Sequence, residues 1–295
     1  MMNIQTSVIT GLRDLAPSYD VILCDVWGVV HNGRRYFTDA CAALGRFREG
    51  GGVVVLVTNA PRPSAPVREQ LDRLGVPRAT FDDIVTSGDV TLALIARHGA
   101  APLHHIGPER DLTLFSILAS QTGIAPPRTS LADASYVVCT GLFDDQSETP
   151  EDYDAALAEM KSRGMELISA NPDLVVHVGD RLLYCSGAIA DRYEKLGGKV
   201  IQAGKPHAPI YERAMEIAQK ICGRPIDRAR VLAIGDGMRT DIKGACDFGL
   251  DALFVADGIH QDDVNGAGGL DLARLAAFLE NANSRPKAAI ERLCW

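Results

Sequence analysis

The chain contains short runs of apolar residues that are continuous rather than alternating. Three of them are VILCDVWGVV from Val21, GGVVVLVTNA from Gly51 and RVLAIGDG from Arg230, and DALFVADG from Asp251 is similar. A strand with such a run is buried on both faces, as happens where helices cover both sides of a parallel sheet. This feature therefore predicts a core built on parallel strands.

Helical patterns lie between these runs. Val67, Leu71 and Leu74 repeat at spacings of four and three residues and stop at Gly75. A second apolar stripe runs through PIYERAMEIAQKIC, residues 209–222. The alternation of strand and helix indicates an α/β fold with a doubly wound parallel sheet, similar to a Rossmann fold.

The length of 295 residues is sufficient for two domains. The middle of the chain has strand-like runs of its own, SYVVCTG and MELISA, and a helical stretch, EDYDAALAEMKSRG. We therefore expect an α/β cap domain, residues 83–200, inserted into a discontinuous catalytic core of residues 1–82 and 201–295.

Charge and composition argue against two classes of partner. The formal net charge of −8 disfavours nucleic acid and anionic membranes. The start of the chain lacks a secretory pattern, and the apolar runs are too short to span a bilayer. The seven cysteines include no C-x-x-C pair, which favours reduced thiols over a disulfide framework or a zinc site. We expect a cytoplasmic protein. His104 and His105 are adjacent and could suggest a pair of metal ligands. Adjacent residues on a strand point to opposite faces and could not bind the same metal. We therefore expect both histidines in a solvated loop.

Polar residues gather where the apolar runs end. Asp25 ends the first run, Thr58 and Asn59 end the second, and Asp236 and Asp241 follow the third. In an open parallel sheet, ligands bind outside the carboxyl ends of the strands. A single aspartate in such a place is more often a turn or helix cap, but the whole set is expected to converge on one site.

The motifs resemble those of the haloacid dehalogenase (HAD) superfamily of phosphohydrolases. The matching pieces are CDVWGVV, VTN, GKP with Lys205, and GDGMRTDIKGA, in the family's order and spacing. The most similar branch is class IIA, which includes sugar-phosphate and 4-nitrophenyl phosphatases and carries a large α/β cap between the second and third motifs. The cap of this branch has sequences like ANPDLVV and YCSGAIA, which occur here at Ala170 and Tyr184.

The resemblance implies a Mg²⁺-dependent hydrolase. Asp25 would attack phosphorus and form an aspartyl phosphate. The carboxylates of Asp25 and Asp236 and the backbone carbonyl of Trp27 would bind Mg²⁺. Asp241 would orient Lys205 or a metal-bound water.

The resemblance also assigns residues to the substrate, expected to be a small phosphorylated metabolite. Thr58 and Asn59 would bind the phosphoryl oxygens, and Lys205 would neutralise charge on nucleophile and phosphate. Asn171 and Asp173 in the cap would contact the substrate. Caps of this type often pair, so a homodimer is one of the expected oligomeric states.

Trp27 departs from the family pattern. Hydrolytic members usually have D-x-D, in which the second Asp shuttles protons, but the indole N–H of tryptophan cannot. Losing such help typically costs a factor of about 10² to 10⁴. His31 could supply a proton near neutral pH, although a loop role is the commoner reading. The alternatives are a catalytically weak or inactive phosphate-binding regulatory protein, a phosphotransferase, or a phosphonate-cleaving enzyme.

Overall fold

The computed structural model describes residues 6–178, 181–266 and 268–295, and the chain divides into two compact units. The first unit holds the described residues of Met1–Thr58, Arg68–Val85 and Tyr211–Trp295. The second holds Asn59–Val67 and Thr86–Ile210. Each unit is built around its own parallel sheet, and the domain boundaries drawn from the sequence stay a prediction.

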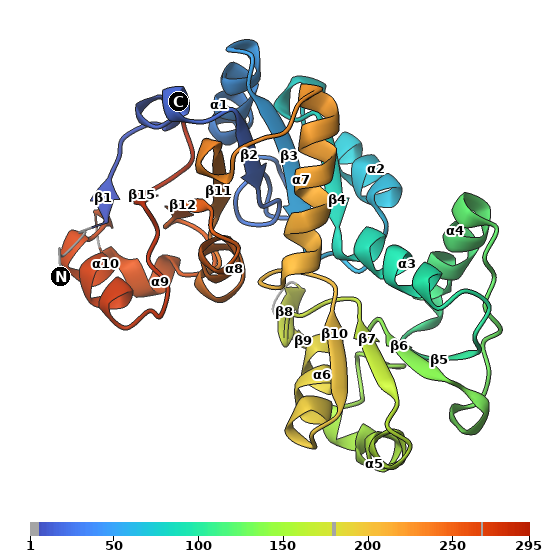
Figure 1. Ribbon diagram of the computed structural model, residues 1–295. Helices are drawn as coiled ribbons and strands as arrows, with labels where there is room; N and C mark the ends of the chain where they lie inside the picture. The colour runs from blue at the N-terminus through green and yellow to red at the C-terminus, as the bar shows by residue number, and fades with distance from the viewer. Residues whose placement is uncertain (1–5, 179–180, 267) are drawn as a thin grey trace. The chain divides into compact units, whose positions relative to one another are not determined.

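A seven-stranded sheet forms the centre of the first unit. Its strand order is β1–β15–β12–β11–β2–β3–β4, and Figure 1 shows β2 and β11 in its middle. The strands are β1 (Ser7–Val8), β2 (Val21–Cys24), β3 (Val53–Thr58), β4 (Asp83–Thr86), β11 (Val231–Gly235), β12 (Asp251–Val255) and β15 (Ala288–Ile290).

The predicted apolar runs are the central strands of this sheet. Every residue of β2, β3 and β11 is buried, and β2 pairs in parallel with both β11 and β3. Helices accompany the strands, as the α/β prediction requires, and the predicted fold class is confirmed. The helices are α1 (Thr38–Glu49), α2 (Ser64–Leu74), α7 (Ala208–Cys222), α8 (Lys243–Asp247), α9 (Gln261–Val264) and α10 (Leu272–Glu280).

The strand order reverses between β2 and β11. From β2 the chain proceeds to β3 and β4 on one side, and from β11 it proceeds to β12 and β15 on the other. The N–H of Asp25 extends the β2–β11 pairing by donating to the carbonyl of Ile234 over 2.8 Å. Residues that follow these two strands therefore emerge side by side at the switch point, where open α/β sheets bind ligands.

The second unit has a four-stranded parallel sheet of order β10–β7–β6–β5. Its core includes Val137, Leu157, Leu167, Ile189 and Tyr193, all fully buried. The strands are β5 (Leu103–Ile106), β6 (Tyr136–Cys139), β7 (Glu166–Ser169) and β10 (Lys199–Gln202), and the helices are α3 (Ser87–Arg97), α4 (Thr113–Thr122), α5 (Asp154–Ser162) and α6 (Ser186–Lys195).

Two short antiparallel pairs complete the structure. β8 (Val175–Val178) pairs with β9 (Arg181–Tyr184) in the second unit. β13 (Asn265–Gly266) pairs with β14 (Gly269–Leu270) in the first. None of the helices in the described part of the chain is long and apolar enough to cross a bilayer.

The expectation that His104 and His105 lie in a loop was wrong. Both belong to β5, an edge strand of the second sheet, whose short LHHI sequence lacks an apolar run. The ring of His105 lies edge-on to Phe115, with centroids 5.2 Å apart. Its Nε2 is 3.0 Å from Oγ1 of Thr140, so the ring is fixed on both sides.

The burial of His105 makes the stability of the protein depend on pH. Burial, with the nearby Arg128 and His104, lowers the pKa of His105 to about 4, below the value of about 6.5 expected in the unfolded chain. The stabilisation is complete above pH 6.5 and is lost as the pH falls toward 4. We expect His105 to remove about 2 kcal/mol of unfolding free energy between pH 7 and pH 5.

The variant His105→Gln tests this prediction, because glutamine can still hydrogen bond to Thr140 but does not titrate. Denaturant unfolding at pH 7 and pH 5 should show a smaller loss of stability in the variant than in wild type. An identical loss in the two proteins would contradict the role given to His105.

Candidate active site

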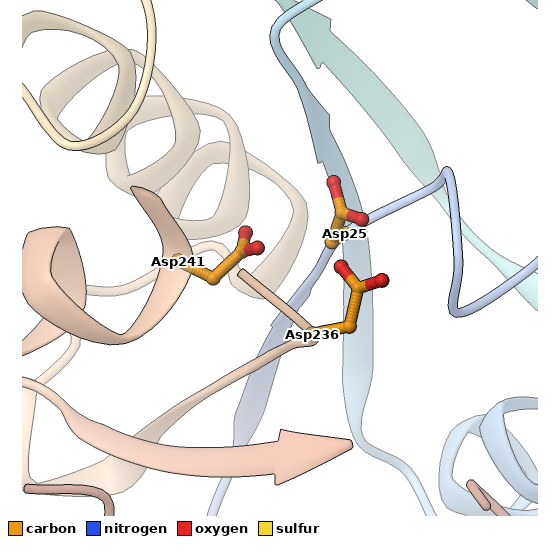
Figure 2. Close-up of side chains that lie close together, drawn as sticks. All are labelled: Asp25, Asp236 and Asp241. Carbon is orange, nitrogen blue, oxygen red and sulfur yellow. The ribbon is translucent and has the colours of Figure 1, made fainter. Parts of the chain in front are cut away.

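Three buried aspartates meet at the switch point of the first sheet. Asp25 follows β2, Asp236 follows β11, and Asp241 lies in the π-helical turn Met238–Ile242. One carboxylate oxygen from each lies within 4.8 Å of the others, and each residue is at most 7% exposed. Figure 2 shows the three carboxylates pointing toward one another. The structure thus brings together the acidic residues that the strand-end pattern placed at one site.

Two glycine-containing loops close on Asp236. A Cβ on Gly28, which has a φ of +85°, would lie 2.0 Å from Oδ2 of Asp236, and a Cβ on Gly258 would lie 2.1 Å from the same atom. Only glycine fits so close an approach. The N–H of Ile259 donates to Oδ2 over 2.8 Å. These three residues were not predicted from the sequence, although glycines directly after apolar runs were a visible signal.

Asp241 is held in place by hydrogen bonds from its own segment of the chain. Its Oδ2 accepts hydrogen bonds from the N–H of Gly237 at 3.0 Å and from the hydroxyl of Thr240 at 3.4 Å. A Cβ on Gly235 would lie 2.2 Å from the carboxylate carbon. The carboxylate therefore packs tightly against the end of β11 and has a defined orientation.

The chemistry of the cluster fits a hard divalent cation. Three carboxylates this close in a buried site repel one another when ionised, and a bound cation relieves that repulsion. Carboxylate and carbonyl oxygens are the protein ligands that Mg²⁺ prefers. Trp27 lies in the loop between Asp25 and Gly28, whose two ends both touch the cluster, and the role of its carbonyl as a metal ligand stays a prediction.

Trp27 and His31 form a small structured loop beside the acids. The N–H of Gly28 donates to the carbonyl of His31 over 2.8 Å, and the two rings meet edge to face with centroids 5.3 Å apart. Nδ1 of His31 accepts the N–H of Gly33 at 2.9 Å. Burial lowers the pKa of His31 to about 4. The imidazole is therefore neutral at pH 7, which does not suit a proton donor at that pH.

The remaining predicted residues divide between the two units. Thr58 ends β3 in the first unit and is 8% exposed. Asn59, Asn171, Asp173 and Lys205 lie in the second unit. Nδ2 of Asn59 donates to Oδ1 of Asp173 at 2.9 Å and to the carbonyl of Lys205 at 3.1 Å, and its Oδ1 accepts the N–H of Lys205 at 2.7 Å. Oδ1 of Asn171 accepts the N–H of Asp173 at 3.0 Å.

Comparison with known proteins identifies the family. Two family models match, one described as haloacid dehalogenase-like hydrolase over residues 22–117 and one as HAD-hydrolase-like over residues 202–278. The crystal structure of a haloacid dehalogenase-like hydrolase from Brucella suis 1330 is 46% identical, with a TM-score of 0.81 over 97% of this chain and 100% of that chain. The chain belongs to the haloacid dehalogenase-like hydrolases. The resemblance read from the sequence motifs is confirmed.

Two more distant relatives are named for phosphatase activity. A D-glycerol 3-phosphate phosphatase from Mycobacterium tuberculosis is 28% identical over 253 residues, which are 84% of this chain and 66% of that protein. The chain thus spans just under two thirds of the length of this curated relative. A possible sugar phosphatase from Cytophaga hutchinsonii is 20% identical, with a TM-score of 0.75 over 97% of this chain and 98% of that one, and shows the fold alone.

Proposed function

We propose that this HAD hydrolase is a Mg²⁺-dependent phosphatase that cleaves a small phosphorylated metabolite through an aspartyl-phosphate intermediate. The observation that carries the proposal is the meeting of three buried carboxylates at the switch point of the sheet. The phosphatase name of the Mycobacterium tuberculosis relative supports the same reaction class. The seven cysteines without a C-x-x-C motif support a cytoplasmic site of action, and the homodimer stays an expectation.

The roles assigned to the acids are those that the family resemblance implies. Asp25 is the nucleophile, and its carboxylate oxygen attacks phosphorus as the bond to the leaving group breaks. Asp25, Asp236 and the carbonyl of Trp27 would hold Mg²⁺, which neutralises charge on the phosphoryl oxygens when bound. Asp241, whose carboxylate accepts the Gly237 N–H, would orient Lys205 or a metal-bound water beside these ligands.

The substrate-binding roles are divided among three polar residues and one cation, with Asn59 in support. The Thr58 hydroxyl is assigned to a phosphoryl oxygen and the Lys205 ammonium to the charge that develops on the phosphate. The amide of Asn59 bonds to Asp173 and to the backbone of Lys205, so it positions the lysine segment. Asn171 and Asp173 are assigned to the organic part of the substrate.

Proton transfer is the weak step of this mechanism. Trp27 stands where hydrolytic relatives usually carry an acid, and His31 is neutral at pH 7 with Nδ1 already engaged. We therefore expect hydrolysis to favour esters whose leaving groups need no proton. The same observation favours, as a second candidate, a phosphate-binding regulatory protein with little turnover.

Metal dependence gives the test of the proposal. Hydrolysis of 4-nitrophenyl phosphate by wild type should require Mg²⁺ and stop on addition of EDTA. Asp236→Asn should raise the Mg²⁺ concentration for half-maximal rate by about 10-fold or more, because it removes a charged ligand.

Asp247→Asn is the matched control for this experiment. Asp247 lies in α8 of the same segment, and its half-exposed side chain pairs only with Lys243 among the ion pairs of the described residues. Its Mg²⁺ dependence should equal that of wild type. Turnover that survives EDTA, or an unchanged Mg²⁺ requirement in Asp236→Asn, would contradict the proposed metal site.

A further inference from the structure

Two large apolar side chains are exposed beside the acidic cluster. Trp27 is 51% exposed and Ile259 is 71% exposed. Exposed apolar residues usually need no explanation when they are scattered singly. These two are different, because both belong to loops that contact the same carboxylate.

The backbone ties both residues to Asp236. Trp27 directly precedes Gly28, and Ile259 directly follows Gly258, the two glycines at which a Cβ would collide with Oδ2 of Asp236. The N–H of Ile259 itself donates to that oxygen. The indole and the isoleucine side chain therefore leave the backbone at the rim of the acidic cluster.

The indole is held in place from one side. Its six-membered ring lies over Gly33, where a Cβ would come within 2.4 Å of Cη2 of Trp27. The ring of His31 packs edge to face against it, and His31 is only 3% exposed. A side chain fixed by packing loses little entropy when a ligand stacks on its open surface.

We propose that Trp27 and Ile259 form an apolar rim that binds a planar aromatic group attached to the phosphate, so that the preferred substrates are aryl phosphomonoesters. The inference rests on the proposed function and assigns its substrate class. An exposed indole offers a flat apolar surface for offset stacking, and the isoleucine adds aliphatic contact. Aryl esters also have leaving groups that depart without a proton, which matches the absence of an acid at position 27.

Non-hydrolysable ligands test the rim without relying on turnover. Isothermal titration calorimetry with Mg²⁺ present would compare phenylphosphonate with methylphosphonate. We expect wild type to bind phenylphosphonate about 10-fold more tightly. Trp27→Ala should reduce this ratio to about 2 or less, Trp27→Phe should keep most of it, and Ile259→Ala should reduce it by a smaller factor.

The control variant is Leu272→Ala, which removes a side chain that is 63% exposed in α10 and should leave the ratio at the wild-type value. Equal binding of the two phosphonates by wild type would overturn the rim, as would an unchanged ratio in Trp27→Ala or equal weakening of both ligands. Phosphocholine is the third ligand, because an indole can also bind cations, and tighter binding of phosphocholine than of phenylphosphonate would overturn the aryl assignment. Failure of the proposed function appears separately, as absence of Mg²⁺-dependent turnover.

Discussion

Replacing Asp25 by Asn is expected to reduce the turnover of 4-nitrophenyl phosphate by about 10⁴-fold or more, because the amide cannot attack phosphorus. The change should leave the fold intact. Its backbone N–H donates to the carbonyl of Ile234, and this bond of the sheet is the same in both proteins. Steady-state rates with Mg²⁺, together with thermal unfolding, measure the two effects.

Asp39→Asn is the matched control for Asp25→Asn. Asp39 is an exposed residue in the first turn of α1, so its loss should leave the rate within about twofold of wild type. If Asp25→Asn hydrolyses the ester at the wild-type rate, another residue is the nucleophile. If wild type and Asp25→Asn are equally inert while both bind phosphate, the regulatory candidate replaces the phosphatase.

The second large effect is expected from Trp27→Asp, which restores the D-x-D pattern. A carboxyl group at this position can protonate a departing alkoxide and later take a proton from the attacking water. We expect hydrolysis of alkyl phosphates such as glycerol 3-phosphate to accelerate by about 10²-fold to 10⁴-fold. Aryl phosphates should gain much less, because their leaving groups need no proton.

Trp27→Asn separates proton transfer from the loss of the indole. Asparagine has nearly the same shape as aspartate but cannot shuttle a proton, and both variants remove the packing over Gly33. The alkyl rate should rise in Trp27→Asp alone, as measured by phosphate release. Equal rates in the two variants would show that position 27 does not take part in proton transfer.

The main chain of the first sheet was the part most open to prediction from sequence. β2, β3 and β11 are continuous apolar runs, and a strand buried on both faces has no other pattern to follow. The same burial explains why Asp25, at the end of such a run, stood out. β5 was missed because an edge strand can carry polar residues such as His104.

The fine structure of the site was not predictable from strand ends. The contact of Ile259 with Asp236 depends on a loop after β12, and no local pattern marks which carboxylate a backbone N–H will meet. The engagement of the Asn59 amide with Lys205 joins residues 146 positions apart. His31 was suggested as a proton donor from its intrinsic pKa, and only its burial reveals that the ring is neutral.

Trapping the intermediate tests the central claim most directly. Because Trp27 gives no base for the attacking water, the aspartyl phosphate should break down slowly and accumulate. Acid quenching of wild type during turnover with Mg²⁺, followed by peptide mass spectrometry, should find one phosphoryl group on the peptide containing Asp25 and none in Asp25→Asn. Turnover accompanied by a phosphoryl group on a different residue would contradict the account.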